Sequence, residues 1–239
     1  MAVLNTVLPL TRIYRGMEKD YADFAKRLGT DKILDIASGS AGPTDNLLRD
    51  ARRSGLNLPK IVVSDLFPQP ERWQQLKTEF GEEAFAYIES PFSFADAARG
   101  EFPAVSIITA LHHLRPEDAA ELLQDMVRNG KSIFIAEPYP RSGWDLFRVF
   151  LPLALPLAFF VPFLRPMSFA AKLCCFSGIT PFMIYIDGLV SVCRIYNIDE
   201  ISAMLTPELS EKVIISAQYY PAIDGIIGGK SFSISIVQK

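Results

Sequence analysis

Cysteine and histidine are scarce in this chain, and their scarcity excludes several kinds of site. Among 239 residues there are three cysteines and two histidines, and no C-x-x-C pair occurs among Cys174, Cys175 and Cys193. Disulfide frameworks and structural zinc sites need more of these residues at set spacings. Neither is therefore predicted, and a reducing, cytoplasmic setting is expected.

An excess of positive charge is also missing. The chain has 24 Lys and Arg against 27 Asp and Glu, and the basic residues are scattered. Nucleic-acid binding requires clustered basic charge, so no nucleic-acid partner is expected. The apolar residues near the N-terminus precede Arg12 and Arg15 instead of following a basic stretch, which is the wrong order for a secretory signal.

Apolar residues are abundant, at 49% of the chain, and they follow a regular plan. Apolar runs of strand length alternate with helical patterns, which is typical of a parallel sheet covered by helices. The expected strands are 32–37, 60–65, 84–89, 104–110 and 131–137, and the expected helices are 14–28, 43–54, 69–80 and 116–129.

The alternation lapses after the fifth strand. The segment 138–190 is rich in Pro, Phe and Leu, after which a helix at 199–205 and two strands at 212–219 and 230–237 are expected. A glycine-containing loop joins those two strands, so an antiparallel pair is predicted. The fold class is therefore α/β: one domain over 1–239 with a doubly wound, mostly parallel seven-stranded sheet, an antiparallel last strand and a Pro/Phe-rich insertion.

The strongest local signal is D-I-A-S-G-S-A-G-P at 35–43, between an apolar strand and a helix. Small residues let the backbone approach a ligand, and strand ends in open α/β sheets border the binding crevice. Ala37 stands where the first glycine of a dinucleotide fingerprint would stand, and the Lys-Ser/Thr pair of a P-loop is missing. The pattern predicts a nucleotide-like ligand of another kind.

Residues 35–43 resemble the glycine-rich first motif of class I S-adenosylmethionine-dependent methyltransferases. Asp65, after the second strand, stands at the place of the family's ribose-binding acid, and 108–114 resembles the end of its fourth strand, beside the methionine part of the cofactor. The resemblance implies a Rossmann-like fold and S-adenosyl-L-methionine as cofactor. The cofactor-binding residues that it implies are Asp35, Ala37, Ser38, Gly39, Gly42, Asp65, Leu66, Ala110 and Leu111.

A further pattern is similar to one found in a bacterial branch of small-molecule methyltransferases. It consists of D-G-L-V-S at 187–191 followed by Arg194 and Tyr196. Arg194 is expected to pair with Asp187 or Glu137 and so to brace the insertion.

Asp65 also has a physical reason to bind a sugar. A carboxylate at a strand tip accepts two hydrogen bonds from a diol, and its charge strengthens them. The alternative is that Asp65 only begins the turn at Phe67-Pro68, as Asp often does before a loop. Asp35 has a similar alternative, namely support of the glycine-containing loop.

His112, His113 and Glu137 are the candidate catalytic residues. An imidazole titrates near neutral pH, so either histidine is able to take a proton from an acceptor. The alternative is a histidine that bonds neighbouring backbone and shapes the pocket. Glu137 is a candidate for acceptor contact, and its alternative is a strand-end carboxylate facing solvent. No metal is expected, because no acidic cluster accompanies the histidines.

The insertion 138–190 is interpreted as a lid over a small, largely apolar acceptor, because its many phenylalanines suit an apolar pocket. A subunit interface in a homo-oligomer ranks second and contact with a membrane surface third. The uncharged run 149–164 is shorter than the roughly 20 residues of a spanning helix and contains three prolines.

Methyl transfer to the small acceptor is the favoured function. Two alternatives have the same fold but do not transfer a methyl group. One is a homologue that binds the cofactor and promotes cyclisation or rearrangement, because a sulfonium stabilises developing negative charge. The other is a catalytically silent binding subunit.

Overall fold

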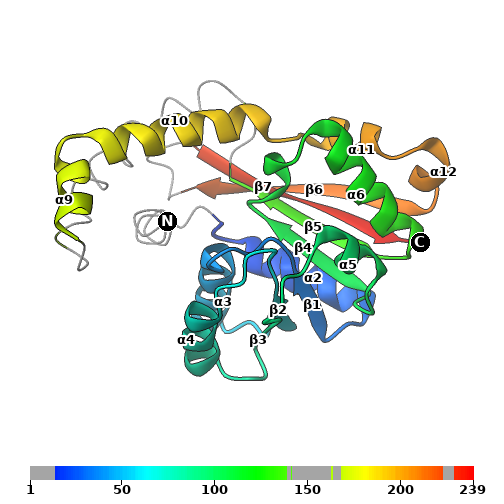
Figure 1. Cartoon of the computed structure of the whole chain (residues 1–239). Coiled ribbons are helices and arrows are strands. Elements are labelled where there is room, and N and C mark those ends of the chain that lie inside the picture. Colours follow the sequence, from blue (N-terminus) through cyan, green and yellow to red (C-terminus); the bar gives the residue numbers. More distant parts are fainter. Residues whose placement is uncertain (1–13, 139–140, 142–162, 164–167, 223–228) are drawn as a thin grey trace.

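The computed structural model describes residues 14–138, 141, 163, 168–222 and 229–239 (Figure 1). Most of the first half of the expected insertion, and with it the run 149–164, therefore lies outside the described residues. The lid interpretation of 138–190 remains a prediction there.

A seven-stranded sheet forms the centre of the protein, in the order β3-β2-β1-β4-β5-β7-β6. Its strands are β1 (Lys32–Asp35), β2 (Lys60–Val63), β3 (Phe85–Tyr87), β4 (Ala104–Ile108), β5 (Ser132–Glu137), β6 (Val213–Ala222) and β7 (Gly229–Gln238). Only β7 runs antiparallel to its neighbours β5 and β6. The predicted mostly parallel sheet with an antiparallel last strand is confirmed.

Helices cover both faces of the sheet. They are α2 (Met17–Leu28), α3 (Gly42–Ser54), α4 (Pro70–Phe80), α5 (Phe94–Arg99), α6 (Pro116–Arg128), α9 (Phe169–Phe176), α10 (Ile179–Arg194), α11 (Ile198–Met204) and α12 (Pro207–Ser210), with a 3-10 turn, η1 (Leu111–His113). Figure 1 shows α2 and α3 on one side of the sheet, and α5, α6 and α11 on the other.

The core lies between these layers because β4 and β5 are mostly apolar and lie at the centre of the sheet. Every residue of both strands is buried, as expected for central strands covered on two faces. Phe134 of β5 packs against Tyr21 and Phe24 of α2, with ring centroids 5.0 and 5.5 Å apart. Burying one such side chain stabilises the fold by about 1.5–3 kcal/mol.

All seven expected strands and the expected helices are present, and the strands differ from the sequence analysis at their ends. The short helices α5 and α12 were not expected. The first strand was expected to reach Ala37, but it ends at Asp35 because Ala37 turns into the left-handed region at φ 53°. The fourth was expected to reach Ala110 and ends at Ile108, before Thr109 at φ 59°. The chain thus leaves the sheet earlier than the apolar pattern suggests.

The sequence analysis missed α9 and α10. Both helices are apolar on nearly all sides, so no amphipathic period distinguishes them. Within the described ranges no single helix is long and apolar enough to cross a membrane. Only α9 and α10 taken together meet that length and composition, and they are bent by 69° at the break between them.

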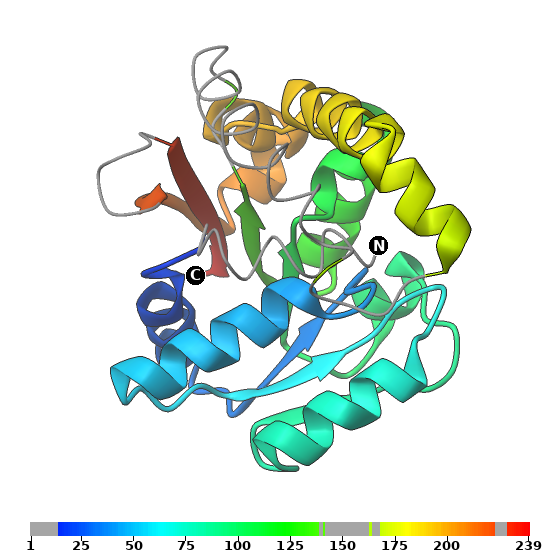
Figure 2. The ribbon, with the colours of Figure 1, turned by 90° about the vertical axis from the view of Figure 1, so that its left-hand side faces the viewer.

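Figure 2 faces the edge at which the parallel strands end, with α3 and α4 below it and α9 and α10 above. The carboxyl ends of strands in open α/β sheets border the ligand crevice. The cofactor-binding and catalytic candidates from the sequence lie at the ends of β1, β2, β4 and β5 at this edge or directly after them.

Candidate active site

The loop after β1 alternates between ordinary and left-handed backbone. Ala37, Gly39 and Ala41 have φ angles of 53°, 52° and 56°. An L-residue in this region costs about 1–2 kcal/mol, so the two alanines are strained where glycine would not be. A Cβ added to Gly39 would meet no atom within 4 Å, so open space borders the backbone there. The loop therefore leaves room for a ligand close to its main chain.

Asp35 lies behind this loop and supports it. Its carboxylate accepts hydrogen bonds from the hydroxyls of Thr44 at 2.6 Å, Ser106 at 2.8 Å and Ser38 at 3.0 Å. The side chain is buried, and burial raises the pKa of Asp35 to about 6, although the three hydroxyls lower it. Asp35 thus joins the loop to α3 and β4, and its effect on a bound ligand would pass through the loop.

Asp65 touches the same loop from the side. Its Oδ2 accepts the backbone N–H of Gly39 at 2.8 Å, and its Oδ1 accepts that of Phe67 at 2.8 Å. The interpretation of Asp65 as the start of a turn therefore holds, but each oxygen keeps a second lone pair for another donor. The side chain is partly exposed, and the next residue, Leu66, is 54% exposed.

Helix α4 holds the other side of Gly39. The indole Nε1 of Trp73, which is fully buried, donates to the Gly39 carbonyl at 3.0 Å. The N–H and the carbonyl of Gly39 are thus bonded to two different elements. The sequence analysis missed Trp73, because nothing in its local pattern indicates a bond to a carbonyl 34 positions earlier.

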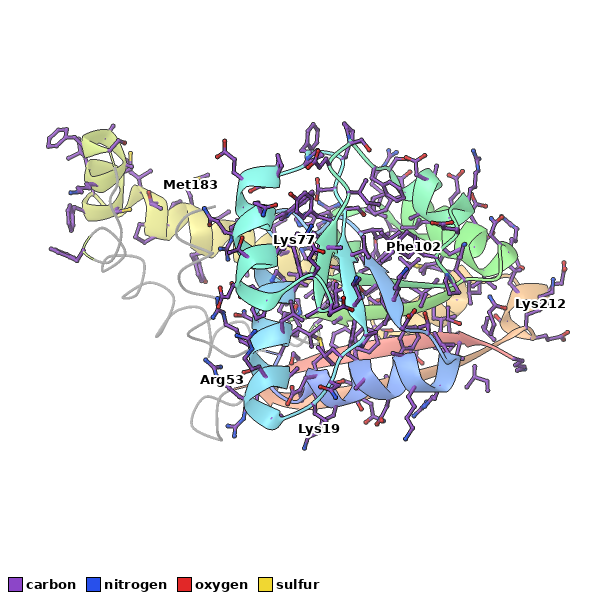
Figure 3. All side chains as sticks on the ribbon, turned by 90° about the horizontal axis from the view of Figure 1, so that it is seen from below. Lys19, Arg53, Lys77, Phe102, Met183 and Lys212 are labelled. Atoms are coloured by element: carbon purple, nitrogen blue, oxygen red, sulfur yellow. The ribbon has the colours of Figure 1, made fainter. Side chains whose placement is uncertain are left out.

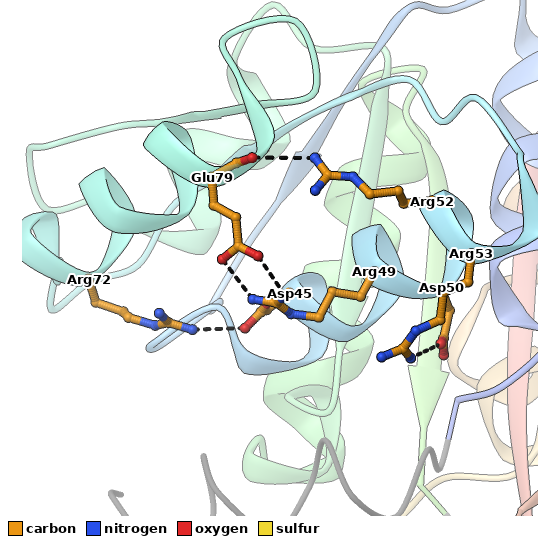
Figure 4. Close-up of polar contacts among 7 residues, drawn as sticks. All are labelled: Asp45, Arg49, Asp50, Arg52, Arg53, Arg72 and Glu79. Carbon is orange, nitrogen blue, oxygen red and sulfur yellow. Dashed lines mark hydrogen bonds and ion pairs between the residues drawn. The ribbon is translucent and has the colours of Figure 1, made fainter.

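An ion-pair network joins α4 to the first turns of α3 (Figure 4). Asp45 accepts hydrogen bonds from Arg49 at 2.7 Å and from Arg72 at 2.8 Å, and Arg49 also pairs with Glu79 at 2.5 Å. Asp45 is buried, so its two arginine bonds are screened less than surface pairs are. This network fixes the helix that carries Trp73.

The end of β4 is a second strained point. Thr109 has φ 59°, which is unusual for a β-branched residue. A hydrogen bond of 2.5 Å joins its hydroxyl to that of Tyr14, a residue that the sequence analysis did not single out. Ala110 and Leu111 follow and are buried, so they form the wall after the strand.

His112 and Glu137 form a buried pair between the ends of β4 and β5. His112 Nδ1 lies 2.8 Å from Glu137 Oε2, and the His112 backbone N–H donates to Glu137 Oε1 at 3.2 Å. Glu137 is 1% exposed, so the interpretation of this residue as a solvent-facing carboxylate is wrong. When Nδ1 carries the proton that the carboxylate accepts, Nε2 keeps its lone pair and is able to act as a base.

His113 is more exposed than His112, and their rings are tilted at 40° with centroids 4.2 Å apart. Partial burial and the neighbouring His112 lower the pKa of His113. Its carbonyl accepts Arg194 Nη2 at 2.9 Å. Arg194 was expected to pair with Asp187 or Glu137, but among the described residues it forms an ion pair with neither and bonds the His113 backbone instead.

The predicted site residues thus meet at one edge of the sheet, in two groups. The loop residues Ala37, Ser38, Gly39 and Gly42 lie beside Asp65, with Asp35 behind them. Ala110, Leu111 and His112 follow the end of β4, and Glu137 is the last residue of the neighbouring strand β5. Within the described part of the chain, no group of three or more His, Cys, Asp and Glu side chains is placed to hold a metal ion.

Comparison with known proteins gives structural matches only. No protein-family model and no curated protein matches the sequence. The methyltransferase domain of bacterial CtHen1 is 12% identical, with a TM-score of 0.51 over 94% of this chain and 99% of that one.

The O-methyltransferase NcsB1 of neocarzinostatin biosynthesis is also similar. Its complex with S-adenosylmethionine and 2-hydroxy-5-methyl naphthoic acid is 13% identical, with a TM-score of 0.53. Its complex with S-adenosyl-L-homocysteine and 1,4-dihydroxy-2-naphthoic acid is 12% identical, with a TM-score of 0.55. Each match covers 99% of this chain, which spans 57% of NcsB1. The chain has the fold of the class I S-adenosylmethionine-dependent methyltransferases.

Proposed function

We propose that this protein binds S-adenosylmethionine beside Gly39 and Asp65 and transfers its methyl group to a hydroxyl of a small, largely apolar acceptor. The observation that carries the proposal is the meeting of two sites at one edge of the sheet. At the first, a loop with open space beside Gly39 follows β1, and the Asp65 carboxylate follows β2. At the second, the buried His112–Glu137 pair lies at the ends of β4 and β5.

The residues present fit the cofactor. The space beside Gly39 admits a ligand to the backbone, and Asp65 retains lone pairs for the two hydroxyls of a ribose. Leu66 offers an exposed apolar surface next to Asp65 for a base. Ala110 and Leu111 are buried and lie in the chain between the end of β4 and His112.

When bound, the cofactor supplies an already activated methyl group. The protein's task is then to align the acceptor for in-line attack and to remove its proton, and orientation is the larger contribution. His112 Nε2 takes the hydroxyl proton, while Glu137 holds the imidazole in the required tautomer and stabilises it once it is charged.

A hydroxylated apolar acceptor suits this pair. A buried base is most useful for a hydroxyl whose proton leaves during transfer, and an apolar surrounding excludes water from the reaction. The naphthoic acid ligands of NcsB1 belong to that protein, but they support a hydroxylated aromatic compound as the first class to test here.

Calorimetric titration tests the cofactor site. Folded wild-type protein is expected to bind S-adenosylmethionine and S-adenosylhomocysteine, and Asp65→Asn is expected to weaken both at least tenfold. Asp31→Asn is the matched control, because Asp31 is exposed at the opposite end of β1. Failure of the folded wild type to bind either compound would refute the proposed function.

Turnover is tested with a set of hydroxylated naphthoic acids and other small phenols. Equal amounts of S-adenosylhomocysteine and methylated product are expected. Conversion of an acceptor without release of S-adenosylhomocysteine would contradict methyl transfer and favour the cyclisation or rearrangement alternative.

A further inference from the structure

We propose that α9 and α10 form a membrane-docking element that seats the protein on the surface of a lipid bilayer. Large apolar side chains line the exposed side of both helices, and we call this surface the apolar stripe. It includes Phe169, Leu173 and Phe176 of α9, and Ile179, Phe182 and Met183 of α10. This proposal does not depend on the proposed function.

The stripe lies along one side of each helix. On α10 its residues recur at intervals of three and four and continue to Val190, which places them along one side of the helix. Phe169 is 82% exposed, whereas Cys175 and Val192 on the other side are buried. Figure 3 shows Met183 on a helix pair that stands apart from the packed sheet.

Charge is nearly missing from this element. Between 168 and 193 only Lys172 and Asp187 are charged. A protein interface surrounds its apolar centre with a polar rim and forms about one hydrogen bond per 100–200 Å². The stripe offers few such groups, while a bilayer interior requires none. The occupant that suits it is therefore lipid, not a second protein surface.

The sequence before the stripe extends the same composition. Residues 149–164 contain no charged side chain, so from 149 to 193 the charged residues are Arg165, Lys172 and Asp187 alone.

The geometry favours lying in the interface over crossing it. The 16 residues of α10 extend about 24 Å at 1.5 Å each, less than the roughly 30 Å of a bilayer core. The 69° bend between α9 and α10 also prevents a single straight span. Because the element has little basic charge, its binding should depend on apolar burial and not on anionic headgroups.

The element is attached close to the candidate active site. At the C-terminal end of α10, Arg194 donates to the His113 carbonyl, and the hydroxyl of Tyr196 donates to the Leu114 carbonyl at 2.7 Å. Docking through the stripe would therefore bring the carboxyl ends of the parallel strands, where the candidate active site lies, near the bilayer.

Vesicle sedimentation of the full chain tests the proposal. The protein is expected to sediment with phosphatidylcholine vesicles, and the bound fraction should not change with added phosphatidylserine or with high salt. The double variant Phe169→Glu, Phe182→Glu is expected to weaken binding at least tenfold.

A matched pair of single variants controls for general effects of a new charge. Ile179 on the stripe and Ile214 on β6 are both 57% exposed. Ile179→Glu is expected to weaken binding and Ile214→Glu to leave it unchanged. Three results would overturn the proposal: wild-type protein that stays in the supernatant, binding only to anionic vesicles, or stripe variants that dissolve a dimer while vesicles have no effect.

A measurement without stripe substitutions makes the test independent of variant folding. Cys174 is exposed on α9, and in a Cys193→Ser background it is labelled with a polarity-sensitive fluorophore. Its emission is expected to shift to shorter wavelength when phosphatidylcholine vesicles are added. An unchanged emission spectrum would contradict insertion of α9.

Discussion

Glu137 holds His112 at two points, because one carboxylate oxygen lies 2.8 Å from the ring Nδ1 and the other accepts the backbone N–H at 3.2 Å. The two residues are 25 positions apart: His112 follows the end of β4, and Glu137 is the last residue of the adjacent strand β5. His112 is 3% exposed and Glu137 1%, so water competes little for either contact. The imidazole is therefore fixed in orientation before any acceptor arrives.

Glu137→Gln is expected to lower kcat by about 10²–10⁴-fold, the usual range for loss of a general base. The glutamine amide is able to donate to Nδ1, which moves the ring proton to Nε2 and removes the base. The affinity for S-adenosylhomocysteine is expected to stay within about twofold of wild type, because Glu137 does not touch the cofactor loop. Steady-state kinetics and calorimetry check the two parts, and an unchanged kcat would exclude the pair from proton transfer.

Asp35 predicts an unusual pH dependence of stability. Its pKa is raised from 3.8 to about 6, so the folded state binds the proton more tightly than the unfolded state. The stabilisation from protonation is present at about pH 4 and is lost as the pH rises through 6. The difference between the two pKa values corresponds to about 2–3 kcal/mol.

Urea unfolding of wild type and Asp35→Asn at several pH values checks this expectation. Asparagine does not titrate, and the other ionisable groups cancel when the two proteins are compared. The unfolding free energy of wild type should fall relative to that of Asp35→Asn between pH 4 and 7. A constant difference over that range would show that Asp35 titrates normally.

Trp73→Phe is expected to weaken cofactor binding by about three- to tenfold. Phenylalanine keeps most of the buried aromatic surface but leaves the Gly39 carbonyl without its donor, so the loop must be ordered on binding. Tyr87→Phe is the control. It removes an exposed hydrogen bond of 2.7 Å from the Tyr87 hydroxyl to Gln74, which lies on the same helix as Trp73. Equal affinities for all three proteins would exclude Trp73 from positioning the loop.

Ala37→Gly is expected to raise the free energy of unfolding by about 0.5–1 kcal/mol, because glycine relieves the strain of a positive φ at this position. Ala95→Gly, at an exposed position of α5, is expected to lower it by about 1 kcal/mol. Thermal and urea unfolding measure both. A loss of stability in Ala37→Gly similar to that in Ala95→Gly would show that the left-handed alanine carries no strain.

The sequence by itself determined the sheet and the place of the candidate site. Apolar runs such as 104–110 and 131–137 specify buried central strands because both faces must be covered, and the small residues at 35–43 specify a turn that a ligand is able to approach. Asp65 was identified by the family resemblance, and a carboxylate after a strand also has a defined chemical use at that edge. These are local features, so a linear pattern is enough to predict them.

Only the tertiary structure decided which groups meet. The bond from Trp73 to Gly39, the pair of His112 with Glu137 and the contact of Tyr14 with Thr109 join residues 25 to 95 positions apart, and no local pattern records such separations. The exposure of the apolar side chains of α9 and α10 is likewise a result of the tertiary structure, because the sequence indicates only that this segment is apolar. The sequence shows that a segment is apolar, but only the fold determines whether that segment is packed inside the protein or exposed on its surface.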